Sequence, residues 1–474
     1  MTECNAAQLE FHGLGRRAVV ADFNGGKISS DGGVLLLREV EARTGILARL
    51  AEQFVDHRKP EAIEHRVREL VAQRVLGLAL GYEDLNDHDV LRLDPLMAVA
   101  ADKADPTGQN RLCERDKGKA LASSSTLNRL ELTPANANAE ARYKKIVANP
   151  AGMDRLLVDC FLEAYDTPPQ TLWIDLDATD DPIHGERQEG RFFHADYDGY
   201  CYLPLYIFSG PHLLCARLRP SNIDACEGSV QEVERIVGSI RARWPEAKIV
   251  VRADSGFCRE DLMAWCEAQG VDYVLGLAKN KRLLTASLGA RVQAQIDFLH
   301  SGQSTRVFCQ FDYRTLDTWS RERRVVCKAE HLAKGPNPRY VVTSLSPKDA
   351  DARTLYEDIY CARDDMENRI KEQQLDLFAD RTSTATLRAN QIRLYFSSFA
   401  YVMLCALRRL GLVGTELERA QCGTLRLRLL KIGAQVRISV RRVWVSFSDS
   451  FPNAAVLRQA LARIRSPALA PSGP

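Results

Sequence analysis

The sequence lacks several features that would assign a protein to a class at once. None of its 13 cysteines forms a Cys-x-x-Cys pair, which argues against a structural zinc site and a disulfide framework and fits a reducing cytosol. The net charge is only +2, so a nucleic-acid partner would need cations gathered in one region. The start has no apolar core of a signal peptide, and the apolar stretch from Leu394 is too interrupted to span a bilayer. We therefore expect a cytoplasmic protein without membrane contact, in which this stretch is a buried helix.

The length and composition indicate a globular protein with more than one domain. At 474 residues the chain is too long for one simple core, and 45% of its residues are hydrophobic and 27% charged. Residues 1–165 carry apolar residues at three-and-four spacing, for example in VLLLREVEARTGILARLAEQF. This spacing predicts a mostly helical N-terminal region.

The period of the apolar residues changes at Thr171. Three strands are predicted in a row, followed by helix, strand, helix and strand. In order, these segments are LWIDLDA, YCYLPLYIFSG, HLLCARLR, SVQEVERIVGSIRARWP, AKIVVRAD, REDLMAWCEAQG and VDYVLGLA. The order is that expected of a ribonuclease-H-like mixed sheet, so residues 166–282 are interpreted as the first part of such an α/β core.

The rest of the chain divides into three predicted parts. Residues 283–350 are predicted to be a β-rich insertion. Residues 351–412 would form the second part of the core, with one strong helix and a further helical run. Residues 413–474 would form a basic C-terminal region with a strand near 436–447 and a disordered tail, SPALAPSGP.

Two acids interrupt the apolar strand LWIDLDA. Successive strand side chains point to opposite faces, so Asp175 and Asp177 share a face, about 7 Å apart. A buried pair of carboxylates is unfavourable unless a positive charge lies nearby. The pair therefore indicates either an edge strand with one solvated face or a metal site.

Two further segments offer an acid for such a site. Asp254 ends the strand AKIVVRAD just before a helix, a place where sheets bind ligands but where Asp also commonly caps helices. The helix YCARDDMENRIKEQQ places five residues within one arc of about 80°, namely Tyr360, Arg363, Glu367, Lys371 and Gln374. This stripe is typical of i, i+4 salt bridges, or of a surface that joins a metal-binding carboxylate to cations for phosphate oxygens.

Together, two strand aspartates and one helix glutamate form a possible set of three carboxylates. Hard oxygen ligands suit Mg²⁺ or Mn²⁺, which need few protein ligands and accept substrate oxygens as well. Two such ions can activate a nucleophile and stabilise the leaving oxygen of a phosphodiester. The set therefore favours metal-dependent chemistry on phosphodiesters, with two ions.

Several segments resemble a known family over nearly the whole chain. They are DLDATDDPIHGERQEG, CYLPLYIFSG, VVRADSGF and YCARDDMENRIKE, with SSDGGVLLLREVE, GYEDLNDHDVLRLDPL and LRANQIRL. The sequence resembles the DDE transposases of bacterial insertion sequences, in the IS-four superfamily and most like its IS-thirteen-eighty group. The resemblance implies a nucleoid-associated enzyme that binds terminal inverted repeats, cleaves DNA and transfers the strand to target DNA. Holding two DNA ends together implies at least a homodimer.

The resemblance also implies which residues are catalytic. Asp177, Asp254 and Glu367 would bind the metal ions. Asp177 is preferred to Asp175 because the family's first aspartate is closely followed by a threonine, here Thr179. Asp175 remains an alternative ligand or a supporting acid.

The Glu-bearing helix resembles the family pattern Tyr-x2-Arg-x3-Glu-x6-Lys. Tyr360, Arg363 and Glu367 match it, but the last position is Gln374 instead of lysine. The resemblance implies DNA-phosphate contacts for Tyr360 and Arg363, and Lys371, one turn before the departure, is expected to supply the missing charge.

Cations gather toward the end of the chain. Between Arg381 and Val445 there are twelve Lys and Arg against two Asp and Glu, a local excess of +10. Such clustering is typical of phosphate-backbone binding, although it also occurs on solvated faces. The helical region 1–165 resembles the portion of the family that recognises DNA ends. Trp319, in the insertion, is either a core residue or one that stacks on a flipped base.

Two other functions stay open from the sequence. One is a catalytically inactive or domesticated DNA-binding protein of the same fold, for which Gln374 is the only local sign. The other is a glycoside hydrolase that uses Asp177 and Asp254 without a metal. The basic C-terminal region and the Arg-bearing helix have no role in that second alternative.

Overall fold

The computed structural model describes residues 8–466, which form two compact units. One unit is Asn149–Cys405, and the other joins the residues up to Ala148 with those from Ala406 onward. The basic C-terminal region, predicted as a separate part, belongs to the same unit as the N-terminal residues. From position 467 on, the tail predicted to be disordered lies outside the described residues.

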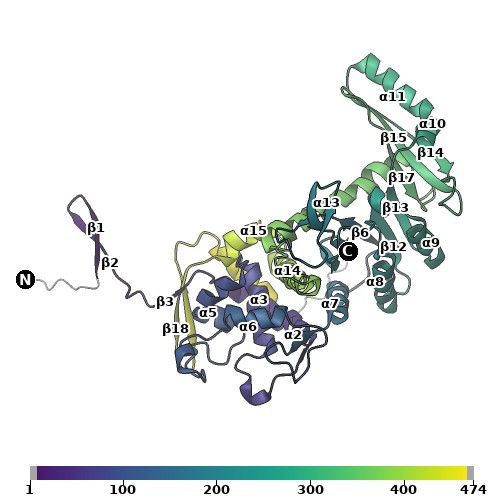
Figure 1. Cartoon of the computed structure of the whole chain (residues 1–474). Coiled ribbons are helices and arrows are strands. Elements are labelled where there is room, and N and C mark those ends of the chain that lie inside the picture. Colours follow the sequence, from purple (N-terminus) through teal and green to yellow (C-terminus); the bar gives the residue numbers. More distant parts are fainter. Residues whose placement is uncertain (1–7, 467–474) are drawn as a thin grey trace, which may run out of the picture. The chain divides into compact units, whose positions relative to one another are not determined.

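The unit Asn149–Cys405 is built on a nine-stranded mixed sheet (Figure 1). Its strands are β6 (Thr171–Ala178), β10 (Leu205–Ser209), β11 (His212–Arg217), β12 (Lys248–Ala253), β13 (Asp272–Leu277), β14 (Thr305–Tyr313), β15 (Arg323–Leu332), β16 (Gly335–Pro336) and β17 (Arg339–Thr343). They follow the order β11-β10-β6-β12-β13-β17-β15-β14, with β16 paired to β15. β10 is antiparallel to its neighbours β6 and β11, while β12 is parallel to β6 and β13.

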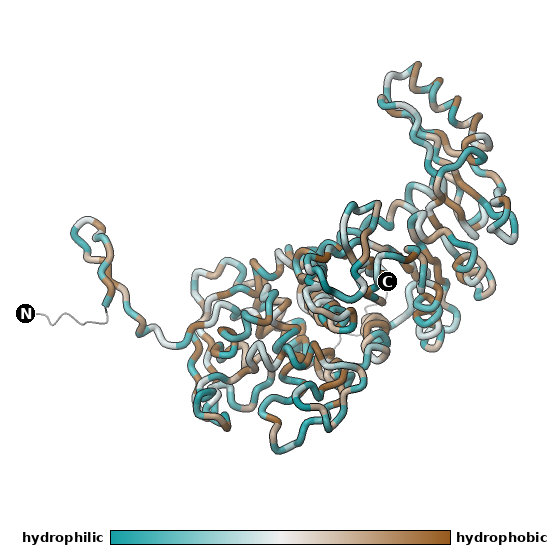
Figure 2. Tube along the Cα trace, viewed as in Figure 1, coloured by the Kyte–Doolittle hydropathy of each residue, from teal (hydrophilic) through white to brown (hydrophobic). Residues whose placement is uncertain are grey.

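One face of this sheet packs against helices. The face includes Leu172, Ile174 and Leu176 of β6, which alternate with the acids of the same strand. The covering helices are α7 (Pro150–Leu162), α8 (Ser229–Arg243) and α9 (Glu260–Gln269). Several strands of the sheet appear as hydrophobic stretches in Figure 2. Burial on this face explains why apolar residues dominate the predicted strands.

The opposite face carries the acids and is covered by an irregular helical segment. This segment follows the sheet strands in the order α12 (Ala352–Thr354), π-helical η5 (Leu355–Tyr360), 3-10 η6 (Cys361–Arg363), α13 (Asp364–Lys371) and π-helical η7 (Glu372–Asp376). Leu355 and Tyr356 pack on Val250 and Val274 of the sheet. The sequence predicted one strong helix here. The π-helical turns on both sides of α13 are of a kind that is rare and often found at functional sites.

Residues 283–350 differ from the predicted β-rich insertion in two ways. They begin inside helix α10 (Lys281–Ala286) and continue into α11 (Leu288–Ser301), so helices precede the strands. The strands that follow extend the central sheet, because β17 pairs with β13 and β15 pairs with β17. The segment is therefore a continuation of the sheet.

A small sheet and a long helix complete this unit. The small sheet comprises β7 (Asp181–Pro182), β8 (Phe192–His194) and β9 (Gly199–Tyr202). It splits the predicted strand YCYLPLYIFSG, whose second half is β10. The apolar stretch from Leu394 lies in α14 (Leu387–Leu407), where Leu394, Tyr395 and Phe396 are buried, as predicted. Among the described residues, no helix is long and apolar enough to cross a membrane.

The other unit is mainly helical in its first part, with short strands. Its α-helices are α1 (Val34–Thr44), α2 (Ile46–Ala51), α3 (Val67–Ala79), α4 (His88–Leu91), α5 (Pro95–Ala100), α6 (Ser124–Glu131), α15 (Cys422–Leu425) and α16 (Ala454–Arg465). Gly33, just before α1, lies so close to the C-terminal segment that a Cβ there would be 2.0 Å from the Leu429 carbonyl oxygen. The glycine pair of SSDGG is thus required by close backbone contact.

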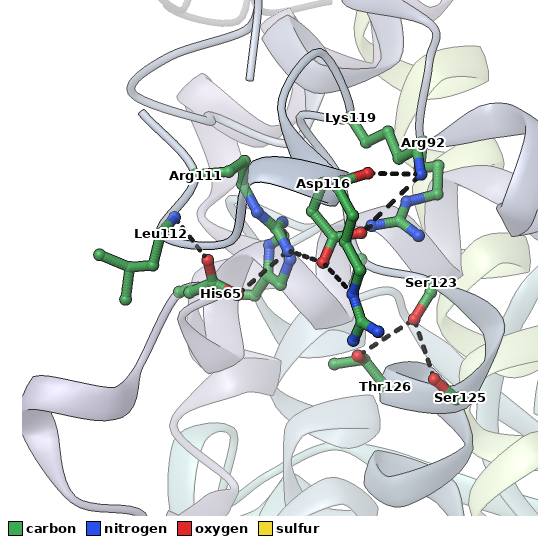
Figure 3. A network of polar contacts seen from close by, with 12 residues as sticks. His65, Arg92, Arg111, Leu112, Asp116, Lys119, Ser123, Ser125 and Thr126 are labelled. Carbon is green, nitrogen blue, oxygen red and sulfur yellow. Dashed lines mark hydrogen bonds and ion pairs between the residues drawn. The ribbon is translucent and has the colours of Figure 1, made fainter. Parts of the chain in front are cut away.

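A polar network holds the loop around Arg111 against the start of α3 (Figure 3). Arg111 hydrogen-bonds the ring of His65 and pairs with Glu64, while Arg92 pairs with Asp116 at 3.1 Å. Burial, together with the surrounding cations, lowers the pKa of His65 to about 2. His65 is therefore neutral and serves as a structural partner of the arginine.

Three strands from the two ends of the chain form a sheet in this unit. β3 (Lys27–Ser29) pairs antiparallel with β18 (Ala434–Ile438), which pairs with β19 (Val443–Phe447). A single strand was predicted near 436–447. The structure corrects this to a hairpin, in which the Ser439 amide donates to the Arg442 carbonyl.

Candidate active site

The acids of β6 face the same side of the sheet as a row of β12 residues. Strand register pairs Trp173 with Val250 and Asp175 with Arg252. The last pair is Leu176 with Ala253, so Asp177 and Asp254 come next at the C-terminal ends of two parallel strands. A sheet brings such ends together at one edge, and ligands commonly bind there.

Asp175 is neutralised within the protein. Arg252 donates from Nε to Asp175 Oδ1 at 2.6 Å and from Nη2 to Oδ2 at 2.8 Å. Arg252 also donates from Nη1 to the Ile359 carbonyl oxygen at 2.8 Å, and its guanidinium lies over the Trp173 ring. Both side chains are buried, and burial raises the pKa of Asp175 against the lowering effect of Arg252. This bidentate pair joins β6 and β12 to the helical segment, so Asp175 has a structural partner already.

Asp177 has no such partner. Its Oδ1 accepts a hydrogen bond from the adjacent Ala178 amide at 3.1 Å, and the guanidinium of Arg363 is 3.8 Å away. Burial raises the pKa of Asp177 to about 6; Arg363 opposes this, and Asp254 and Glu367 add to it. The three predicted catalytic acids therefore interact electrostatically at this edge of the sheet.

Asp254 has the helix-capping role that the sequence allowed, at the end of its strand. It is the N-cap residue of the short helix η4 (Ser255–Phe257) and accepts a hydrogen bond from the Gly256 amide at 2.9 Å. The adjacent strand β13 carries Gly276, where a Cβ would lie 2.6 Å from the Tyr360 hydroxyl. Only glycine leaves room there, so Gly276 lets Tyr360 reach the Asp254 end of the sheet.

The residues of the predicted stripe on the Glu-bearing helix differ in how far their side chains are exposed to solvent. Arg363 is buried, and its Nη1 has no hydrogen-bond partner among the described residues. Glu367 and Lys371 are exposed. Gln374, the departure from the pattern that the helix resembles, donates from Nε2 to the Asp180 carbonyl oxygen at 3.0 Å. It therefore ties the helix to the loop after β6 and leaves Lys371 as the exposed cation of the stripe.

The donors of this site match a hard divalent cation in type. All three acids offer carboxylate oxygens, and the raised pKa of Asp177 means that a positive charge beside it would be favourable. Across residues 8–466, however, no three His, Cys, Asp or Glu side chains are arranged as a ready metal-binding group. The residue types fit the metal, and its binding belongs to the proposal below.

Three residues at or near the candidate site were not predicted from the sequence. Arg252 lies in an apolar strand, and its partner is known only once the strand register is known. Gly276 gave no signal of its own in the strand VDYVLGLA. Tyr197, between β8 and β9, lies near the acids: burial, followed by the charges of Asp180 and Asp177, raises its pKa to about 12.

Trp319 is a core residue. It is buried, packs edge-on against Tyr313 at a centroid distance of 5.6 Å, and has the Arg323 guanidinium over its ring. Both alternatives were open from the sequence, and this packing favours the structural one.

Comparison with known families identifies the chain. A family model described as "Transposase DDE domain group 1" matches residues 11–468. The chain belongs to this family of DDE transposases. Members of the family generally use divalent metal ions.

Solved structures offer a distant similarity to this transposase-family chain. One is a cryo-EM structure of the piggyBac transposase synaptic complex with hairpin DNA, at 11% sequence identity and a TM-score of 0.41. The match covers 92% of this chain and 82% of the other. No curated protein sequence matches the chain.

Proposed function

We propose that this DDE transposase cuts DNA at the terminal inverted repeats of its own insertion sequence and joins the cut strand to target DNA. The observation that carries the proposal is the meeting of Asp177 and Asp254 at two parallel strand ends, with Glu367 acting electrostatically on Asp177. The strand order of the central sheet supports a ribonuclease-H-like core. Within the family, we assign the chain to the IS-four superfamily and its IS-thirteen-eighty group.

Each residue of the site has a role in this reaction. Asp177, Asp254 and Glu367 would hold Mg²⁺ or Mn²⁺ as a pair of ions. Bound ions would stabilise charge on the phosphodiester oxygens. Arg363, with its buried and unpartnered Nη1, would donate to a phosphate oxygen beside Asp177.

Two balanced steps follow from these roles. In the first, the oxygen of water bonds to phosphorus as the bond to the 3′ oxygen breaks, which leaves a 3′-hydroxyl and a 5′-phosphate. In the second, this hydroxyl bonds to a phosphorus of the target DNA and displaces the 3′ oxygen of the target strand. Lys371 and Tyr360 would hold the DNA backbone on either side of Glu367 on the same helical segment. Two DNA ends joined together would require a homodimer.

The test is metal-dependent cleavage of a duplex that carries the end of the element. The wild-type chain should cut it with Mg²⁺ or Mn²⁺ and not in EDTA. Asp177→Ala, Asp254→Ala and Glu367→Ala should each lower the rate at least a thousandfold, about 4 kcal/mol of transition-state stabilisation, while DNA binding is kept. Asp364→Ala is the matched control, because Asp364 is an exposed acid of the same helix and should keep most of the activity.

Other outcomes point to other functions. Tight binding by the wild-type chain without cleavage at any metal concentration would identify an inactive DNA-binding protein of the same family. If the variants of Asp177, Asp254 and Glu367 all cut DNA at the wild-type rate, the assignment of the site would be overturned. Metal-independent hydrolysis of a glycoside would favour the carboxylate-pair alternative.

A further inference from the structure

The β18–β19 hairpin extends beyond the sheet to which it belongs. β3 pairs with β18 only at Ala434, Gln435 and Val436, and the pairing of β18 with β19 continues to Ile438 and Val443. The tip ribbon, defined here as Arg437–Trp444, is therefore two-stranded. All of its side chains are exposed except that of Ile438, which is half-buried. The buried Ala434 and Val436 anchor its base in the unit.

The tip ribbon carries positive charge that nothing else in the described chain neutralises. From Arg419 to Ser448 the sequence contains no Asp or Glu. The side chains of Arg437, Arg441 and Arg442 make no hydrogen bond or ion pair with any other part of residues 8–466. By contrast, Arg428, an exposed arginine of the same unit, pairs with Glu416.

The ribbon also exposes apolar side chains among its arginines. Val440, at the turn, is fully exposed, and Trp444, paired across the strands with Arg437, is 44% exposed. Folding of the unit gives no reason for a valine and a tryptophan to lie in water here. Arginines interleaved with an aromatic and a small apolar residue match the phosphates, base edges and thymine methyl groups of DNA.

We propose that the tip ribbon enters the major groove of duplex DNA, with Arg441 and Arg442 as its principal contacts. Paired strands lie about 4.8 Å apart, so a ribbon with its side chains fits the major groove, about 12 Å wide, and not the minor groove, about 6 Å wide. Charge complementarity selects an anionic partner over an apolar protein surface, and interleaved arginines and apolar residues favour DNA as that partner. The inference rests on the proposed function, since it takes DNA as the partner, and it adds a contact surface outside the catalytic acids.

The test is the affinity of the double variant Arg441→Ala, Arg442→Ala for DNA in EDTA, so that cleavage has no part in the result. The probes are a duplex with the element end and a scrambled duplex of equal length. The variant should bind the element end at least tenfold more weakly. The negative slope of log affinity against log salt should become less steep by about 1 to 2. Because both side chains are exposed and unpartnered, the melting temperature should stay unchanged.

Arg465→Ala is the matched control, because Arg465 is an exposed arginine of the same unit whose partner is Glu39. It should bind DNA within twofold of the wild-type chain. Equal binding by the double variant and the wild type would overturn the ribbon contact and leave the catalytic proposal standing. Failure of the wild type to bind either duplex would overturn both. Normal DNA binding with an altered oligomeric state would show that the ribbon contacts protein instead.

Dimethyl sulfate distinguishes the two grooves, because it methylates guanine N7 in the major groove and adenine N3 in the minor groove. The wild-type chain should protect guanine N7 at positions that the double variant leaves reactive. Protection confined to adenine N3 would overturn the assignment of the groove.

Discussion

The two aspartates of β6, Asp175 and Asp177, differ in how their negative charge is balanced. Toward the middle of the strand, Asp175 is held by both sides of the Arg252 guanidinium, at 2.6 and 2.8 Å. At the C-terminal end, Asp177 has its nearest cation, Arg363, at 3.8 Å and two other acids acting on it. Both carboxylates are largely buried and lie two residues apart.

This difference separates a structural acid from a candidate catalytic one. A buried carboxylate with an internal counter-ion needs no further positive charge. The Asp175–Arg252 pair instead connects two strands to the helical segment. A buried carboxylate without a close counter-ion is costly unless a ligand supplies positive charge. The position of the nearest guanidinium therefore supports Asp177 over Asp175 as the metal ligand, which agrees with the choice made from the sequence.

Removing one partner of the Asp175–Arg252 pair should have the largest effect on stability. Asp175→Ala leaves the Arg252 charge buried without its partner, so the free energy of unfolding should fall by about 3 to 5 kcal/mol. Asp177→Ala should cost less than about 1 kcal/mol, because it removes an acid that has no close counter-ion. Urea unfolding of both variants measures the contrast.

The double variant Asp175→Leu, Arg252→Met is the control for this contrast. It removes both charges and keeps apolar volume, so it should recover most of the stability that Asp175→Ala loses. A loss as large as that of Asp175→Ala would mean that the contact of Arg252 with the Ile359 carbonyl, and not the ion pair, holds the joint.

The pH dependence of stability should differ between wild type and Asp177→Asn. In the metal-free protein the pKa of Asp177 is raised to about 6, above the ordinary value of about 4, so the folded state keeps a proton that the unfolded state releases. Stability should therefore fall as pH rises from about 4 to 6, by about 3 kcal/mol in total from this group. The difference between the two unfolding curves, measured in EDTA, isolates that contribution.

The same unfolding measurement with Mg²⁺ or Mn²⁺ tests whether Asp177 binds the metal, without an activity assay. The ion should stabilise the wild-type chain more at pH 7 than at pH 5, because it competes with the proton for the carboxylate. Asp177→Asn should lose most of this stabilisation. The same metal response in both proteins would remove Asp177 from the set of metal ligands.

The smallest effect is expected from Gln374, which ties the helical segment to the loop after β6. Gln374→Ala removes one hydrogen bond to the Asp180 carbonyl and should cost about 1 kcal/mol of unfolding free energy. Gln374→Lys introduces a cation and keeps a donor, so it should be close to wild type in stability and bind DNA more tightly. No change in stability with alanine would leave position 374 without a structural role.

Local patterns in the sequence predicted much of the core. Alternation of apolar residues located β6, β12 and β13, and it correctly placed Asp175 and Asp177 on one face. Alternation gives no strand register, so the pairing of Asp175 with Arg252, 77 residues later, could not be predicted. The exposure of Glu367 and the π-helical turns around α13 also depend on tertiary packing, which helical spacing alone does not contain.

The C-terminal hairpin shows a different limit. Its sequence alternates through the turn, and the turn residues Ser439 to Arg442 include no Gly, Pro, Asn or Asp. The usual composition signal of a tight turn was therefore absent, and one long strand was predicted. The pairing of β18 with β3 joins the two ends of the chain, and no local pattern reports a contact at that distance.

That pairing has a consequence for synthesis of the chain. The Gln435 side chain donates to the Gly25 carbonyl, 410 positions earlier. At 5 to 20 residues per second, the first strand leaves the ribosome roughly 20 to 80 s before its partner. The unit with the candidate catalytic acids is complete on the nascent chain before the unit that surrounds it in the sequence. A ribosome that stops before residue 434 therefore releases a chain with all three candidate catalytic acids and an unfinished N-terminal unit.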